Sequence, residues 1–177
     1  MLLTNIQADA SLSYFISNSC TENNVSIIIA HEISNEDYCI IKVDDYYNSL
    51  HLAITPPSPD CLIIQRCSFG YIITIVELKD ISSPRSFNKE QIRQKFETCL
   101  LDFMSNKFRR YFYDLNIIIK DIHLFFVSDP YQQITKPNKI KDKSLLIDIF
   151  LSLRPLTFVN KKYYINPILP NPTIYEC

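Results

Sequence analysis

Three ionisable residues lie at the ends of two strongly apolar segments near the middle of the chain. Asp60 comes directly before the segment 61–66, and Glu77 and Lys79 close the segment 71–79. Alternate side chains of a strand point to the same side, so Glu77 and Lys79 are expected to share one face. Carboxylate oxygens are the ligands that hard divalent cations prefer, so these residue types indicate a site for Mg²⁺ or Mn²⁺.

The pairing register of a hairpin would bring the two carboxylates together. A turn at residues 68–69 pairs Cys67 with Gly70, the one glycine of the chain, where a positive φ is often required. Continuing this pairing to the other end places Asp60 opposite Glu77. Opposed residues on a shared face have Cβ atoms about 5 Å apart. Two ionised carboxylates at that distance repel each other unless a cation lies between them.

Both faces of the expected hairpin are apolar. One face carries Leu62, Ile64, Tyr71, Ile73 and Ile75, and the other carries Ile63, Ile72, Val76 and Leu78. A sheet that is apolar on both faces is covered on both faces. Because uncompensated charge is costly in such a place, the three charged groups are expected at a sheet edge or cleft, with a ligand.

The residues PD, then an apolar segment, then ELK at the end of a second apolar strand resemble the PD-(D/E)XK nuclease superfamily, which has the restriction-endonuclease-like fold. The resemblance covers roughly residues 8–130. It implies that Asp60, Glu77 and the backbone carbonyl of Leu78 bind the metal, and that Lys79 orients the attacking water. The implied reaction is the hydrolysis of phosphodiester bonds in DNA, with Mg²⁺ or Mn²⁺ as cofactor.

The same resemblance implies further polar residues around these three. Family members often add an acidic residue from the N-terminal region, for which Asp9, Glu22 and Glu32 are candidates; the sequence leaves this choice open. They also often carry a polar residue on the helix after the motif strand. Gln91 and Lys95 lie four residues apart, on one face of the expected helix. A solvated helix face is the alternative interpretation of that pair.

Charge is distributed unevenly along the chain. The first 80 residues contain 3 Lys/Arg and 10 Asp/Glu, whereas the remaining residues contain 15 and 9. Basic residues gather at the end of the long expected helix and in the segment KPNKIKDK, and the candidates for DNA contact are Lys107, Arg109, Arg110, Lys139 and Lys141. The alternatives are complementation of a helix dipole and ordinary surface lysines.

The hydrophobic periodicity predicts an α/β (α+β) fold, in which a mixed central β-sheet is flanked by helices. We expect one domain, residues 1–177, with an extended, proline-spaced tail from about residue 166. Asn88 and Gln91 fit a capping box that starts the longest helix. The other expected elements are a helix at 8–19, strands at 24–33, 38–43 and 122–127, a helical turn at 44–50, a helix at 144–153, and a hairpin at 156–165 that turns at Asn160-Lys161.

Composition excludes several classes of protein. A single glycine rules out the glycine-rich phosphate loops of common nucleotide-binding enzymes. No apolar run approaches the roughly 20 residues needed to cross a bilayer, so no membrane association is expected. The 6 cysteines include no CxxC pair, which predicts a reduced, cytoplasmic protein without a zinc site or a disulfide framework.

Two other functions compete with a DNA endonuclease of restriction, repair or mobile-element type. The same fold can serve as an inactive module for nucleic-acid binding or protein assembly, and an RNA nuclease is a more remote alternative. The expected partner is duplex DNA. Because cutting both strands needs two active sites, a homodimer is compatible with the endonuclease hypothesis.

Overall fold

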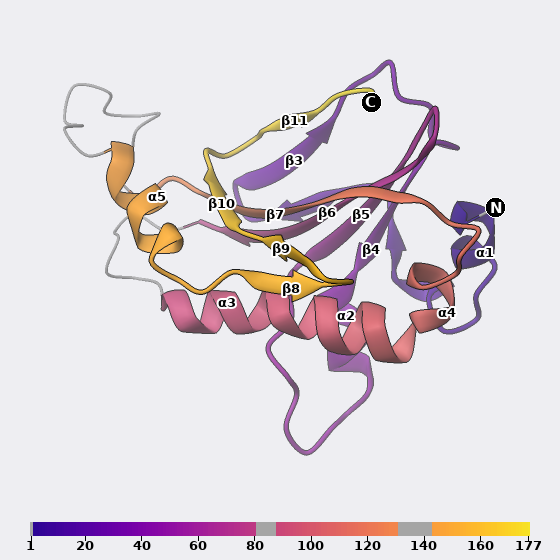
Figure 1. The fold of residues 1–177 in the computed structure, drawn as a ribbon, viewed down its shortest axis with the longest axis horizontal. Coiled ribbons are helices and arrows are strands. Elements are labelled where there is room, and N and C mark those ends of the chain that lie inside the picture. The colour runs from indigo at the N-terminus through magenta and orange to yellow at the C-terminus, as the bar shows by residue number, and fades with distance from the viewer. Residues whose placement is uncertain (1, 81–87, 131–142) are drawn as a thin grey trace.

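The protein is built on a six-stranded mixed β-sheet with helices on its flanks (Figure 1). The structure is a computed structural model, and it describes residues 2–80, 88–130 and 143–177. The strand order is β1-β4-β5-β6-β7-β10. The first four of these strands pair antiparallel with one another, β7 pairs parallel with β6, and β10 pairs parallel with β7. The bounds are β1 (Ile16–Ser17), β4 (Tyr38–Lys42), β5 (Cys61–Cys67), β6 (Gly70–Lys79), β7 (Ile119–Ser128) and β10 (Ile165–Ile168).

The central hairpin has the register that the sequence predicts. Strands β5 and β6 pair from Cys67 with Gly70 to Cys61 with Val76. Gly70 has a φ of 98°, and a Cβ atom there would collide with the carbonyl oxygen of Ile118. The turn therefore requires glycine for both its backbone conformation and its close approach to the neighbouring chain.

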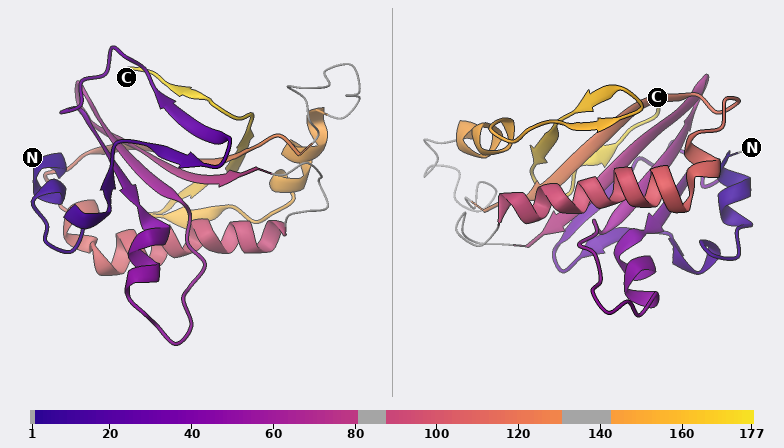
Figure 2. Two further views of the ribbon diagram at one scale, coloured as in Figure 1. Left: turned by 180° about the vertical axis from the view of Figure 1, so that it is seen from behind. Right: turned by 60° about the horizontal axis from the view of Figure 1, so that its bottom comes forward.

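Helices cover one face of the sheet. The long helix α3 (Lys89–Glu97) continues as the π-helical segment η3 (Thr98–Lys107) and runs across the strands, as both views of Figure 2 show. Its buried side chains Phe96, Leu100 and Phe103 form one core with Leu62 and Ile73 of the sheet. The remaining helical segments are α1 (Leu2–Gln7), η1 (Ser13–Phe15), α2 (Val43–Ser49), α4 (Arg109–Phe112) and α5 (Lys143–Leu151).

A smaller sheet covers the opposite face. Its strand order is β11 (Thr173–Ile174), β3 (Val25–Ile29) and β2 (Cys20–Glu22), and it lies across the central sheet from α3 (Figure 1). A second core cluster joins Val25 and Ile27 of this sheet to Ile63, Val76 and Leu78 of the central one. The prediction that the apolar hairpin is covered on both faces is confirmed.

The expectation of a chain without disulfides is wrong for four of the six cysteines. Cys20 is bonded to Cys61, and Cys67 is bonded to Cys177, whereas Cys39 and Cys99 are buried free thiols. The bonded pairs are separated by 41 and 110 residues, so short-range spacing rules could not reveal them. The described helices include none that is long and apolar enough to span a membrane.

The other element predictions differ in outcome. The expected helix at 8–19 is misplaced, because residues 2–7 are helical and residues 16–17 form β1. The C-terminal hairpin of β8 (Leu156–Phe158) and β9 (Lys161–Tyr163) is confirmed, and its turn falls on Val159 and Asn160, both with positive φ. The proline-containing tail is extended, and it supplies β10 and β11.

Candidate active site

The charged residues of the motif meet where β5 begins and β6 ends. Asp60 directly precedes β5, and its Oδ2 accepts a 2.6 Å hydrogen bond from the backbone N–H of Leu78. Glu77 and Lys79 belong to the last three residues of β6, and the Lys79 Nζ lies 3.2 Å from Oε1 of Glu77. The register that pairs the two strands therefore brings the sequence-predicted residues together.

Lys95 joins this cluster from α3, as one of the two helix residues that the sequence suggested. Its Nζ lies 2.8 Å from Oε1 and 3.0 Å from Oε2 of Glu77, whose side chain is fully buried. The start of the helix is fixed by Asn88, whose side chain accepts hydrogen bonds from the backbone N–H groups of Glu90 and Gln91. This N-cap sets the position of the helical turns that carry Lys95 over the sheet.

Gln91, the other helix candidate, has a different environment. Its side chain is exposed, whereas Lys95 is largely buried against the sheet. The capping box is thus only half confirmed: Asn88 caps the helix, and Gln91 takes part through its backbone N–H, which donates to the Asn88 side chain. Of this pair, Lys95 is the residue that contacts the charged cluster.

Burial controls the protonation of the two carboxyl groups. Burial and, to a smaller extent, the negative charge of Asp60 raise the pKa of Glu77 to about 7, although Lys95 and Lys79 oppose the increase. Burial also raises the pKa of Asp60, against the hydrogen bond from Leu78. Ionising both groups is therefore unfavourable without more positive charge close by, and a bound cation would supply that charge.

A third carboxylate, Glu22 of β2, approaches the same cluster. Its Oε2 lies 3.8 Å from the Nζ of Lys79, is shielded from solvent, and has no hydrogen-bond partner among the described residues. Although burial of the ammonium opposes the shift, the negative charges of Glu77 and Glu22 raise the pKa of Lys79. Glu22 also raises the pKa of Asp60.

The two other acidic candidates lie elsewhere. Glu32 is exposed, and its Oε2 is 3.3 Å from Nδ1 of His31. Asp9 is buried against Arg110 and Tyr111, whose side chains both donate hydrogen bonds to its Oδ2. Sequence reasoning could not choose among the candidates because the short strand β2, which positions Glu22, was not recognised as a strand.

The candidate DNA-binding cations that are described lie at the far end of the long helix. Lys107 is 3.9 Å from Asp102, the guanidinium of Arg109 lies 4.2 Å from the ring centroid of Tyr113, and Arg110 pairs with Asp9. Lys95 lies in α3, whereas Lys107 ends η3 and the two arginines begin the separate helix α4. Lys139 and Lys141 fall in 131–142 and lie outside the described residues.

The donor set is chemically compatible with a hard divalent cation. Asp60, which is half-buried, and Glu77, which is fully buried, offer two carboxylates whose pKa values are raised chiefly by burial, and the carbonyl of Leu78 is a further oxygen donor. Within residues 2–80, 88–130 and 143–177, however, no three His, Cys, Asp or Glu side chains are grouped so as to hold a metal ion. A cation here would rely on two carboxylates, backbone and water.

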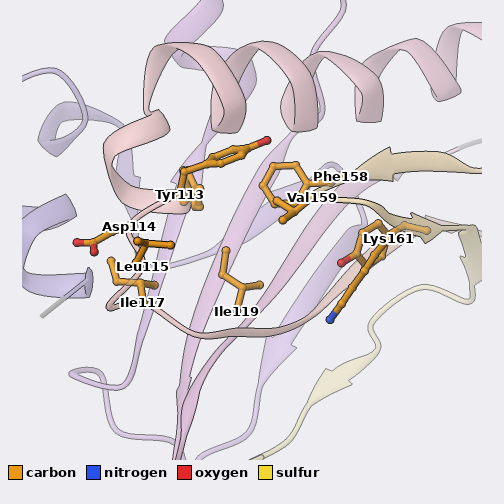
Figure 3. Close-up of a pocket in the computed structure, with 10 residues that line it drawn as sticks. Tyr113, Asp114, Leu115, Ile117, Ile119, Phe158, Val159 and Lys161 are labelled. Carbon is orange, nitrogen blue, oxygen red and sulfur yellow. The ribbon is translucent and has the colours of Figure 1, made fainter.

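A separate cavity of about 280 Å³ lies between the segment that follows α4 and the β8–β9 hairpin (Figure 3). Its wall is largely apolar, with Tyr113, Ile119 and Phe158 facing it and Lys161 at its side. Ile119 starts β7 and is paired with Tyr71, whereas Glu77 is paired with Phe126, near the other end of the same strand. This cavity is therefore distinct from the charged cluster.

Comparisons with protein-family models, curated proteins and solved structures found no match for this chain. The function must therefore be inferred from the geometry and chemistry of the charged cluster.

Proposed function

We propose that the protein is a metal-dependent DNA endonuclease with a restriction-endonuclease-like core. The observation that carries this proposal is the convergence of Asp60, Glu77 and Lys79 at one end of a buried hairpin. The fully buried carboxylate of Glu77, next to the half-buried Asp60, is costly as a purely structural feature, because a buried charge loses its hydration. The same arrangement suits a site that binds a cation and a phosphate.

The arrangement of elements around the cluster supports the same function. Three antiparallel strands, β4, β5 and β6, are followed by the helix α3 and then by β7, which is parallel to β6. This order is compatible with the core that the PD and ELK motifs imply. It places the carboxyl end of β6 beside the first turns of α3, where Lys95 reaches Glu77.

In the proposed mechanism, Asp60, Glu77 and the Leu78 carbonyl hold the cation, whose chemical contribution is to lower the pKa of water and to offset charge on the phosphate. Lys79 orients the attacking water and stabilises negative charge that develops at the scissile phosphate. Lys95 holds the Glu77 carboxylate in place through both of its oxygens.

The proposed substrate is duplex DNA. Lys107 at the end of η3 and Arg109 and Arg110 of α4 are exposed, and we propose that they contact phosphates away from the cleavage site. A homodimer would supply a second active site for the other strand.

The test is cleavage by Asp60→Asn, Glu77→Gln and Lys79→Ala. The amide oxygen introduced by Asp60→Asn would still accept the hydrogen bond from the Leu78 N–H, so this variant removes the charge and keeps the contact. We expect each variant to lose cleavage of plasmid DNA by about 1000-fold or more in Mg²⁺ or Mn²⁺, as for groups that act at the reacting centre.

Glu32→Gln is the matched control, because it removes an exposed carboxylate that does not contact the cluster. It should cleave like the wild type. Circular dichroism should show that all four variants are folded, and a parallel panel of RNA substrates would separate the RNA nuclease alternative. Full activity in all three cluster variants would refute the assignment.

An inactive nuclease-fold module is the second candidate, and one observation favours it. Two ammonium groups, those of Lys95 and Lys79, pair with Glu77 without a metal. Titration calorimetry with Mn²⁺ separates the two candidates: the nuclease binds the ion, and Asp60→Asn weakens binding. A folded wild type that binds no Mn²⁺ and cleaves no nucleic acid would favour the module.

A further inference from the structure

One disulfide joins the hairpin that carries Glu22 to the strand that follows Asp60. Cys20 is the first residue of β2, Cys61 is the first residue of β5, and both are fully buried. Alternate residues of a strand share a face, so Glu22 projects to the same side as Cys20. The crosslink therefore ties β2, the strand that carries Glu22, to Cys61, which directly follows Asp60 in the chain.

A polar contact holds the same hairpin at its turn. Nδ2 of Asn24 donates a 3.0 Å hydrogen bond to Oδ2 of Asp80, which follows β6. Asn23 has a positive φ at this turn, and β2 pairs antiparallel with β3 beyond it. The β2–β3 hairpin is thus tied to the central sheet on both sides of Glu22, covalently at Cys20 and by a hydrogen bond at Asn24.

Glu22 has an electrostatic role in this position. Its Oε2, buried and without a hydrogen-bond partner among the described residues, faces the ammonium of Lys79. Without that carboxylate, less of the positive charge of Lys79 would be compensated. The net repulsion of a cation bound at Asp60 and Glu77 would therefore increase. It would also be less restricted in orientation, because one of the two carboxylates that pair with its ammonium would be lost.

We propose that the Cys20–Cys61 disulfide positions Glu22 against Lys79, so that the crosslink sets the rate of the reaction rather than only the stability of the fold. Glu22 and the disulfide are positioning elements that act through Lys79. This inference rests on the proposed nuclease function and adds to it a covalent requirement outside the motif residues.

A double-mutant cycle tests the coupling. The variants are Glu22→Gln, the pair Cys20→Ala and Cys61→Ala, and the triple combination. We expect Glu22→Gln and the cysteine pair each to lower kcat and weaken Mn²⁺ binding by about five- to tenfold, with little change in KM for DNA. The triple variant should be no worse than either, because both changes remove the same interaction.

The second disulfide provides the matched control. Cys67→Ala with Cys177→Ala removes a crosslink that closes a longer loop, so it should destabilise the protein at least as much. Cys67 lies at the turn end of the hairpin, remote from Asp60. This control should lower the unfolding temperature and leave kcat and Mn²⁺ affinity unchanged.

Each outcome bears on the inference. Independent, multiplicative effects in the triple variant, or equal loss of kcat in the two disulfide variants, would overturn it while the nuclease function stands. If the wild type binds Mn²⁺ but does not cleave DNA, the nuclease function is refuted. The same double-mutant cycle then tests the inference with Mn²⁺ affinity as the measured quantity. Absence of both activities overturns both proposals.

Thiol titration of the unfolded, unreduced chain should find two free thiols, and six would also refute the inference.

Discussion

The two ends of the β5–β6 hairpin differ in what they contribute to the protein. At one end lie the half-buried carboxyl group of Asp60 and the fully buried carboxyl group of Glu77, both with raised pKa values. At the other end, Gly70 forms a tight turn against the Ile118 carbonyl. A disulfide closes each end, Cys20–Cys61 at the charged end and Cys67–Cys177 at the turn.

This contrast separates stability from chemistry within one supersecondary unit. The turn end has backbone geometry that only glycine fits easily, so changes there should alter the free energy of unfolding. The charged end concentrates groups whose burial is unfavourable without a counter-ion, so changes there should alter reactivity and pH dependence. A hairpin apolar on both faces connects the two ends rigidly.

The largest stability effect is expected from Gly70→Ala. The alanine must adopt a positive φ, and its Cβ would collide with the backbone of Ile118, so we expect a loss of about 3 kcal/mol in the free energy of unfolding. Urea denaturation measures this change. The exposed turn residue offers the control Ser68→Ala, which should be nearly neutral. Equal cleavage rates for folded Gly70→Ala and wild type would support the separation, and a rate loss would contradict it.

An effect of similar size at most is expected from pH at the charged end. Burial raises the pKa of Glu77 from its ordinary 4.5 to about 7, so the folded state holds this proton more tightly than the unfolded chain. Stability of the metal-free protein should therefore fall as pH rises from about 5 to 8, by up to about 3 kcal/mol. Asp60, whose pKa is also raised by burial, acts in the same direction.

Urea denaturation at each pH measures this dependence, and two changes should flatten it. Glu77→Gln removes the titrating group, and saturating Mg²⁺ favours its ionised form. Asp9 does not obscure the result: although burial opposes the shift, hydrogen bonds from Tyr111 and Arg110 lower its pKa, so it titrates below this window. Gly70→Ala should keep the wild-type slope. An unchanged slope in Glu77→Gln would show that another group is responsible.

The smallest effect is expected from Arg109→Ala, near the turn end. Arg109 stacks on Tyr113 and is exposed, so its proposed phosphate contact is a single, solvated one. We expect DNA affinity to fall about two- to threefold at physiological salt, and the slope of log affinity against log salt to fall by about one. Fluorescence anisotropy measures both quantities, and Arg109→Lys should restore the slope. A loss of DNA cleavage in Arg109→Ala as large as that in Asp60→Asn would contradict the proposed separation of the two ends.

The central part of the fold could be predicted because its signals are local. The turn at the single glycine fixes the hairpin register, and continuing that register beyond Cys61 and Val76 places Asp60 opposite Glu77. The N-cap Asn88 likewise predicts where the long helix begins. The misplaced N-terminal helix and the unrecognised strand β2 are short elements, whose few residues give weak periodic signals.

The residues alone were sufficient to predict the motif strands and the three charged residues, and the period of two along a strand gave the apolar faces. Tertiary structure alone decided which N-terminal carboxylate reaches Lys79, which helix residue binds Glu77, and which cysteines pair. Those contacts join segments far apart in the chain, and their geometry depends on how the two sheets and the helix pack together. Periodicity within one segment contains no information on that packing.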